Sequence, residues 1–380
     1  KWLDDKRVEV SLDASERDAG NRDFILRFRL QGEQINSGLM TYEWNGEHYF
    51  LMMAQPPKRV EAAQVMKREY LFVVDVSGSM HGFPLDTARK LMRELLGKLR
   101  PEESFNILFF SGGSTVLSSV PLPATPANLQ RAMEMMKAYD GGGGTELVPA
   151  LEKAYDMPHT PDMARSIVVV TDGYISAERA AYDLIRQNLN ATNLFAFGIG
   201  SSVNRHLIEN MAHAGEGEPF VITGPGEVDG VGERFRRYVE APVLSHIKVQ
   251  GSGVELYDME PAEIPVMLAE RPIVVFGKYR HAQPGASLKL TGTAAQGDYR
   301  ASLPLAGEGS RNQAGLLPVL WARQRLMRLS DRQGGDVELN RDAIVDLGLR
   351  YALLTQYTSF VAVDETVVNP DADATDVKQP

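Results

Sequence analysis

The stretch Tyr70–Met80, YLFVVDVSGSM, is the part of this sequence that decides the expected fold. Its unbroken apolar run ends in Asp75, and Ser77 and Ser79 follow at alternate positions. Such a run is typical of a strand buried on both faces, as in a parallel sheet. Ligands of open α/β sheets bind beyond the carboxyl ends of the strands. The three oxygen-bearing side chains are therefore expected at a ligand-binding edge.

Similar apolar runs recur through the middle of the chain, and amphipathic stretches separate them. This alternation predicts an α/β domain over residues 67–240, with a doubly wound, mostly parallel sheet. The segment 114–123 alternates apolar and polar residues and ends in prolines, which favours a short antiparallel edge strand. Strands are expected at 69–76, 105–111, 166–172, 193–200 and 219–223, and helices at 84–99, 127–139, 146–157, 176–189 and 227–240.

The flanks of this domain read as strands broken by Gly and Pro, with a hairpin turn at Asn45-Gly46. We expect residues 1–66 and 241–312 to build one β-sandwich into which the α/β domain is inserted. Two separate small β domains are the alternative. The expected strands lie in 8–12, 22–31, 38–54 and 243–304.

The last part of the chain changes character again. Helices are expected over 316–331 and 341–354, followed by a strand over 357–365. Residues 313–365 are expected to pack on the sandwich. The Asp-rich tail 366–380 is expected to be disordered.

Composition excludes several classes of function. The net charge of −10 argues against a nucleic-acid partner, because phosphate binding needs a basic surface. Without cysteine there are no disulfides, thiolate metal sites or thiol nucleophiles. No window approaches the ~20 apolar residues of a membrane helix, so we expect no membrane insertion. The chain begins at Lys1 rather than methionine, which favours a fragment or a processed product.

Two more loops carry oxygen donors to the same sheet edge. Asp172 follows the strand at 166–172, and Thr145 closes the glycine run 141–144 just before a helix. Carboxylates and hydroxyls without imidazole or thiolate suit Mg²⁺, Mn²⁺ or Ca²⁺. The alternative is a metal-free set of helix caps. Capping explains each residue separately but not their common position.

The motif Asp75-Val76-Ser77-Gly78-Ser79, together with Thr145 and Asp172, resembles the complete metal-ion-dependent adhesion site of a von Willebrand factor type A domain. The resemblance covers about 67–240. It implies that the five side chains hold the metal, directly or through water, and that an acidic residue of a partner protein completes the shell.

The segments PVLWARQRLMRL (318–329) and IVDLGLRYALLTQYTSFVAVDE (344–365) resemble the region after this domain in proteins that pair it with a VIT domain. These are the inter-alpha-trypsin inhibitor heavy chains and their bacterial relatives, some of them sortase-anchored surface proteins. The resemblance implies a hybrid-like sandwich and an extracytoplasmic protein, secreted or at the cell surface, anchored to a bacterial envelope at full length.

The expected rim of the site comprises His81, Gly143, Gly144, Glu146, Gly173 and Tyr174. For His81 an ordinary exposed loop histidine is the alternative. The glycine run lacks the lysine of a phosphate-binding loop, so a flexible hinge for Thr145 or a simple loop is expected instead. The sequence has no HExxH or GxSxG motif, and we expect no enzyme.

The sequence therefore predicts a divalent-metal-dependent protein-binding or adhesion module. Its partner would be a protein that offers an Asp or Glu carboxylate, in the extracellular matrix or on another cell surface. An intracellular assembly factor acting with an AAA+ ATPase is the alternative.

Overall fold

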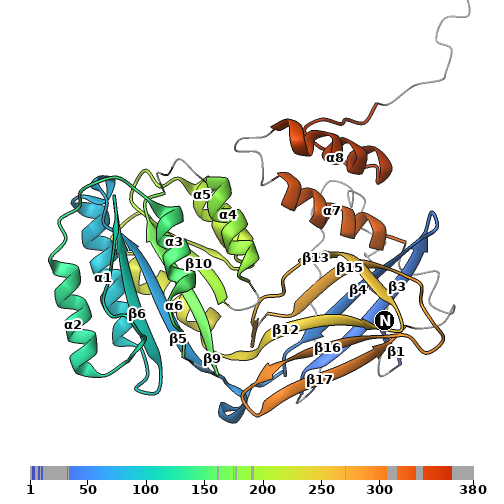
Figure 1. The fold of residues 1–380 in the computed structure, drawn as a ribbon, viewed down its shortest axis with the longest axis horizontal. Helices are drawn as coiled ribbons and strands as arrows, with labels where there is room; N and C mark the ends of the chain where they lie inside the picture. The colour runs from blue at the N-terminus through green and yellow to red at the C-terminus, as the bar shows by residue number, and fades with distance from the viewer. Residues whose placement is uncertain are drawn as a thin grey trace, which may run out of the picture.

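The computed structural model describes residues 2–4, 7–8, 10–11, 32, 34–160, 162–173, 175, 178–189, 192–269, 271–305, 315–330 and 337–361. They form an α/β body and a second body of two antiparallel sheets, and two further helices lie on the second body (Figure 1). The fold class expected from the sequence is confirmed.

A seven-stranded sheet forms the centre of the α/β body, in the order β11-β10-β9-β5-β6-β7, with β8 also paired to β6. The pairs among β5, β6, β9, β10 and β11 are parallel. The expected edge strand at 114–123 is two short strands, both antiparallel to β6. The strands are β5 (Lys67–Asp75), β6 (Ser104–Phe110), β7 (Ser114–Val116), β8 (Leu122–Pro123), β9 (Met163–Thr171), β10 (Thr192–Ile199) and β11 (Pro219–Ile222).

Helices cover both faces of this sheet (Figure 1). Phe72 and Val74 pack with α1, α2 and α6, whereas Leu71 and Val73 pack with α3, α4 and α5. Because both faces are covered, the middle of β5, Tyr70–Val74, is apolar at every position. The helices are α1 (Phe83–Gly97), α2 (Pro126–Lys137), α3 (Leu147–Asp156), α4 (Glu178–Gln187), α5 (Arg205–Ala214) and α6 (Val228–Val239).

Sequence reasoning missed α5. Asn204 caps it, since its side-chain oxygen accepts a hydrogen bond from the amide of Leu207 at 3.2 Å. Leu207, Ile208 and Met211 are buried against the sheet. The cap and this apolar spacing are the signals that could have located the helix.

The second body contains two four-stranded antiparallel sheets, β14-β12-β16-β17 and β13-β15-β4-β3. β4 precedes the α/β body in the chain and β15 follows it, yet the two strands pair along their length. Asn45 and Gly46 both have positive φ, so the expected hairpin turn is confirmed. The strands are β3 (Asn36–Trp44), β4 (Glu47–Gln55), β12 (Pro242–Ser252), β13 (Glu255–Glu260), β14 (Met267–Leu268), β15 (Ile273–Arg280), β16 (Ser287–Ala294) and β17 (Gly297–Pro304).

Near the N-terminus a short antiparallel pair is described, β1 (Trp2–Asp4) and β2 (Arg7–Val8). The strand expected at 22–31 lies outside the described residues. Of the strand expected at 8–12, Val8 ends β2 and residues 10 and 11 are not in a strand, while residues 9 and 12 are outside the described part.

The helix α7 (Leu317–Ser330) packs on the β13-β15-β4-β3 sheet, and α8 (Val337–Arg350) lies against α7 (Figure 1). The prediction of a strand at 357–365 is wrong for residues 357–361, which form no strand. There the chain makes only an isolated bridge between Thr355 and Thr358, because the Thr355 hydroxyl accepts the amide of Thr358 and closes a turn. Residues 362–380, including the expected tail, lie outside the described residues. None of the described helices is long and apolar enough to span a bilayer.

The two bodies share apolar contacts through the segment before β15. Ile264 and Met267 belong to the core of the sandwich, while Val266 and Leu268 belong to the core under α1 and α6. The amide of Val266 also donates to the side-chain oxygen of Asn193 at 2.9 Å. The segment is therefore part of both cores.

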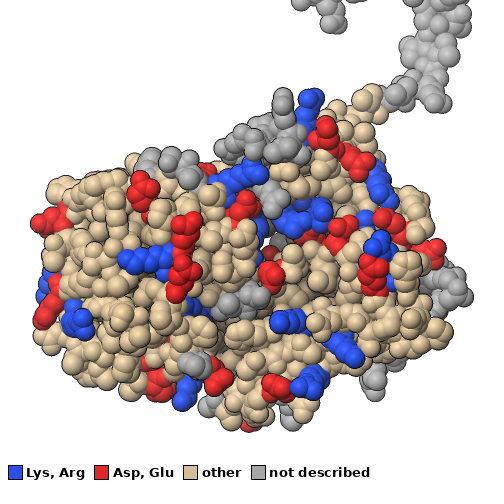
Figure 2. All heavy atoms as spheres, in the orientation of Figure 1, with Lys and Arg blue, Asp and Glu red and all other residues tan. Residues whose placement is uncertain are grey.

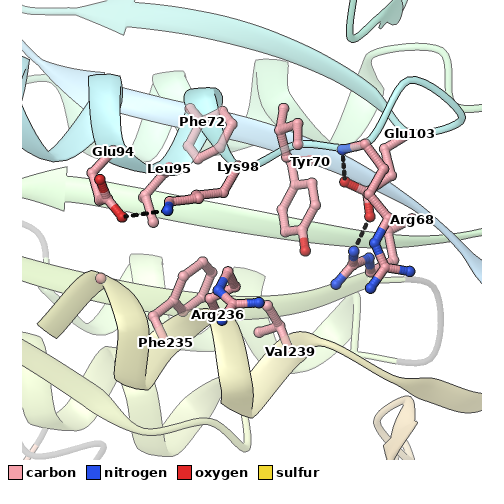
Figure 3. Close-up of a pocket in the computed structure, with 13 residues that line it drawn as sticks. Arg68, Tyr70, Phe72, Glu94, Leu95, Lys98, Glu103, Phe235, Arg236 and Val239 are labelled. Atoms are coloured by element: carbon pink, nitrogen blue, oxygen red, sulfur yellow. Dashed lines mark hydrogen bonds and ion pairs between the residues drawn. The ribbon is translucent and has the colours of Figure 1, made fainter. Parts of the chain in front are cut away.

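A cavity of about 40 Å³ lies between α1, α6 and the start of β5, at the opposite end of β5 from Asp75 (Figure 3). Tyr70 and Phe235 line it, and an ion pair between Arg68 and Glu103 borders it. Ligand pockets usually measure roughly 300–1,000 Å³, so this cavity has room for little more than one water molecule.

Candidate metal centre

The loop after β5 places its oxygen donors close together. Asp75 and Ser77 are fully buried, whereas Ser79 is exposed in a 3₁₀ turn, Gly78–Met80. The amide of Ser77 donates to Asp75 Oδ1 at 2.8 Å, and the hydroxyl oxygens of Ser77 and Ser79 are 3.2 Å apart. The alternate spacing of the three residues thus turns their oxygens toward one another at the end of the strand.

Thr171 holds the second oxygen of Asp75. Its hydroxyl donates to Asp75 Oδ2 at 2.6 Å and accepts the amide of Gly173 at 3.0 Å. Sequence reasoning missed this residue. A polar residue at the end of an otherwise apolar strand, just before Asp172, was the available signal.

Asp172 lies beside Asp75, and its Oδ1 is buried without a hydrogen-bond partner among the described residues. Burial raises the pKa of Asp75, and the negative charge of Asp172 raises it further. The hydrogen bonds from Ser77 and Thr171 lower this pKa but do not cancel the effect of burial. Two buried carboxylates held this close, one with a free oxygen, are an arrangement that a cation would stabilise.

The glycine loop brings Thr145 to the same edge. The amide of Gly78 donates to the carbonyl of Gly143 at 3.1 Å, and the amide of Gly142 donates to the carbonyl of Val76 at 3.0 Å. Half-buried Thr145 follows this loop, and the next amide, that of Glu146, donates to Ser111 at 2.9 Å. Thr145 therefore enters α3 from a loop bonded directly to the serine loop.

The predicted rim residues are placed as follows. Gly143 and Gly144 are exposed and lie against the loop at Gly112, and Glu146 is exposed at the start of α3. Gly173 has a positive φ, and a Cβ there would lie 3.0 Å from the Cβ of Asn204. Tyr174 lies outside the described residues.

His81 is exposed, and its Nδ1 lies 2.7 Å from the carbonyl oxygen of Asp140. It thus has a hydrogen-bond partner at the start of the glycine loop.

The donor set fits a hard divalent cation. Within the described part of the chain, no three His, Cys, Asp or Glu side chains are grouped to hold a metal. The site instead combines two carboxylates with hydroxyls, and the unpartnered oxygen of Asp172 is a ready ligand. Mg²⁺ and Ca²⁺ prefer such oxygen ligands.

The bond from Thr171 can be tested by stability. In Thr171→Val the shape of the side chain is kept, but Asp75 Oδ2 loses its donor while buried. We expect a loss of about 1–3 kcal/mol in the free energy of unfolding in EDTA, measured by urea denaturation. Thr171→Ser keeps the hydroxyl and should lose clearly less. Equal losses in the two variants would show that the methyl group, not the hydroxyl, matters.

The chain is similar to several known proteins. The family pattern of the von Willebrand factor type A domain matches residues 68–219. A von Willebrand factor A domain-containing protein of Dictyostelium discoideum is 26% identical over 90% of this chain and 17% of its own length. Inter-alpha-trypsin inhibitor heavy chain H3 of Bos taurus is 24% identical over 85% of this chain and 40% of its own length. The chain thus spans less than half of these curated relatives.

Two solved structures show the same fold. A von Willebrand factor type A protein from Catenulispora acidiphila superposes with a TM-score of 0.55 at 14% identity, over 86% of this chain and 89% of its own. The ArnB paralog VWA2 from Sulfolobus acidocaldarius gives 0.55 at 17% identity, over 84% and 91%. Sheet order, motif and family pattern agree, and residues 68–219 are a von Willebrand factor type A domain.

Proposed function

We propose that this domain binds a divalent cation, Mg²⁺ in the first place and Mn²⁺ or Ca²⁺ as alternatives, and uses it to hold a carboxylate of a partner protein. Asp75, Ser77, Ser79, Thr145 and Asp172 would hold the ion. The observation that carries the proposal is the buried, unpartnered Oδ1 of Asp172 beside the buried carboxylate of Asp75. Domains of this type often bind a divalent metal and often mediate contacts between proteins.

When bound, the ion supplies an electrophile for an acidic side chain. The two carboxylates formally balance the charge of a divalent ion, and the hydroxyls bring no negative charge of their own. The ion therefore stays an electrophile that can take an outside carboxylate as a further ligand. Neighbouring residues hold the metal-binding side chains in a fixed orientation. Thr171 and the amide of Ser77 fix both oxygens of Asp75, so its carboxylate cannot rotate freely.

Figure 2 shows the charged side chains on one face of the two bodies. There, acidic and basic side chains lie interspersed over both bodies rather than in one broad field. This supports a partner selected at the metal centre rather than by bulk charge. We further propose a secreted or cell-surface protein with an adhesive role, in line with the likeness to inter-alpha-trypsin inhibitor heavy chain H3.

The proposal is tested with the immobilised protein and a panel of candidate extracellular proteins. Binding of a partner is expected in Mg²⁺ and should be lost in EDTA, then return when Mg²⁺ is restored, because the carboxylate has no other cation to bind. Circular dichroism in EDTA checks that the fold persists. Partner binding that is equal with and without EDTA would contradict the metal-dependent mechanism.

A further inference from the structure

Two loops of the domain meet at His81. The serine loop after β5 ends at this residue, and the glycine loop begins at Asp140, 59 residues later. The His81 Nδ1 atom is 2.7 Å from the Asp140 carbonyl oxygen. A carbonyl only accepts, so Nδ1 carries the hydrogen and donates it. The imidazole therefore ties the two loops together on the exposed side of the site.

Gly141 lets the loops come this close. Its φ is +84°, and a Cβ on it would lie 2.9 Å from the Cα of His81. A real side chain would clash with the backbone of the serine loop and would strain its own backbone. The absence of a side chain at this position is thus a requirement of the contact with His81.

The glycine loop is also held elsewhere. Two backbone bonds join Gly142 to Val76 and Gly143 to Gly78, at 3.0 and 3.1 Å. On the side facing α1, Arg89 donates to the carbonyl of Tyr139. The carbonyls of residues 139 and 140 thus each accept a hydrogen bond from a side chain. The next two residues, Gly142 and Gly143, are held by the backbone hydrogen bonds. This pattern differs from the flexible hinge that the glycine run suggests.

We propose that His81 is a positioning residue that clasps the Asp140–Gly144 loop onto the serine loop, so that Thr145 is in place before a cation arrives. This inference rests on the proposed metal site. Fixing the backbone of one residue costs roughly 1–2 kcal/mol in conformational entropy. If the loop is already ordered in the metal-free protein, this cost does not reduce the affinity for the cation. The role of His81 is therefore in the metal-free protein, and it needs no contact with the metal.

The first test uses the metal-free protein in EDTA and reads hydrogen exchange at residues 140–146. One hydrogen bond is worth about 0.5–1.5 kcal/mol, so His81→Leu should speed exchange in this loop roughly 3- to 10-fold. His81→Gln keeps an N–H donor and should restore much of the protection. The matched control is His159→Leu, because exposed His159 bonds the neighbouring carbonyl of Thr160 and, among the described residues, joins no two loops. Unchanged exchange in His81→Leu would overturn the clasp.

The second test is Mn²⁺ affinity, measured by electron paramagnetic resonance of the free ion. We expect binding roughly 3- to 10-fold weaker in His81→Leu, partly rescued in His81→Gln and normal in His159→Leu. Gly141→Ala should weaken it at least as much, since the loops cannot close. Faster exchange with unchanged Mn²⁺ affinity would overturn the preordering of Thr145. Faster exchange in a protein that binds no Mn²⁺ would support the clasp while rejecting the metal site.

Discussion

Asp75→Asn should lower the affinity for Mg²⁺ or Mn²⁺ by on the order of 100-fold or more, with loss of any partner binding that depends on the ion. Asp75 is fully buried, and both of its oxygens are fixed by hydrogen bonds. The substitution keeps the shape of the side chain and removes its negative charge. Isothermal titration with each ion measures the effect.

The same variant should remain folded in EDTA. Burial raises the pKa of Asp75, which means that its charged form is costly without a cation. Removing the charge relieves this cost, but the amide nitrogen of Asn replaces one of the two acceptors of the Ser77 amide and the Thr171 hydroxyl. The two effects oppose each other, so the melting temperature of the metal-free variant should stay within several degrees of that of the wild type. Asp140→Asn is the control, because this carboxylate is 95% exposed at the same rim. If Asp75→Asn binds Mg²⁺ normally, the proposed ligand set is wrong.

Glu47→Ala should cost about 3–5 kcal/mol in the free energy of unfolding, because it leaves the buried ammonium of Lys278 without its main counter-ion. The side chain of Lys278 is 5% exposed, and its Nζ lies 3.1 and 3.2 Å from the two carboxylate oxygens of Glu47. The same Nζ lies 4.0 Å from the ring centre of Trp321 on α7, and 3.9 Å from Asp258. Urea denaturation measures the loss.

The effect should extend to the C-terminal helices. Glu47 also accepts hydrogen bonds from Tyr49 and from Arg350 of α8, and Tyr49 shares a 2.7 Å hydrogen bond with Tyr351. Losing Glu47 thus weakens the contacts that hold α7 and α8 against the rest of the protein. Limited proteolysis of the variant should cut these helices faster than the domain of residues 68–219.

A double variant and a surface pair serve as controls. Glu47→Leu combined with Lys278→Met removes both charges and should recover most of the lost stability, since a buried pair often adds little over apolar residues. Glu255→Ala breaks the exposed pair with Arg280 on the same sheet and should cost less than about 1 kcal/mol. Equal losses for Glu47→Ala and Glu255→Ala would contradict the importance of burial.

The loss should depend on pH in a defined direction. Burial raises the pKa of Glu47, but its bonds with Tyr49 and Lys278 outweigh this and leave the pKa below the ordinary value of 4.5. A lowered pKa stabilises the fold above the pKa of the unfolded chain, and the contribution disappears as pH falls through the folded value. The difference between wild type and Glu47→Ala should therefore shrink in acid.

Much of the fold follows from local patterns. The apolar runs at β5, β6, β9 and β10 identify strands buried on both faces, and the alternation with helices gives the mostly parallel sheet. The strand expected at 357–365 fails as far as it is described, because two threonine hydroxyls close a turn that local β-propensity does not register. Propensity is a weak guide where side chains satisfy the backbone.

By itself, the sequence determined the positions of the oxygen donors, since alternation after a strand and the fixed edge of a parallel sheet are local rules. Only the tertiary structure decided how those donors are held. Thr171 reaches Asp75 across 96 residues, His81 reaches Asp140 across 59, and Lys278 reaches Glu47 across 231. Contacts at such separations depend on which strands become neighbours, and no local pattern in the chain encodes that.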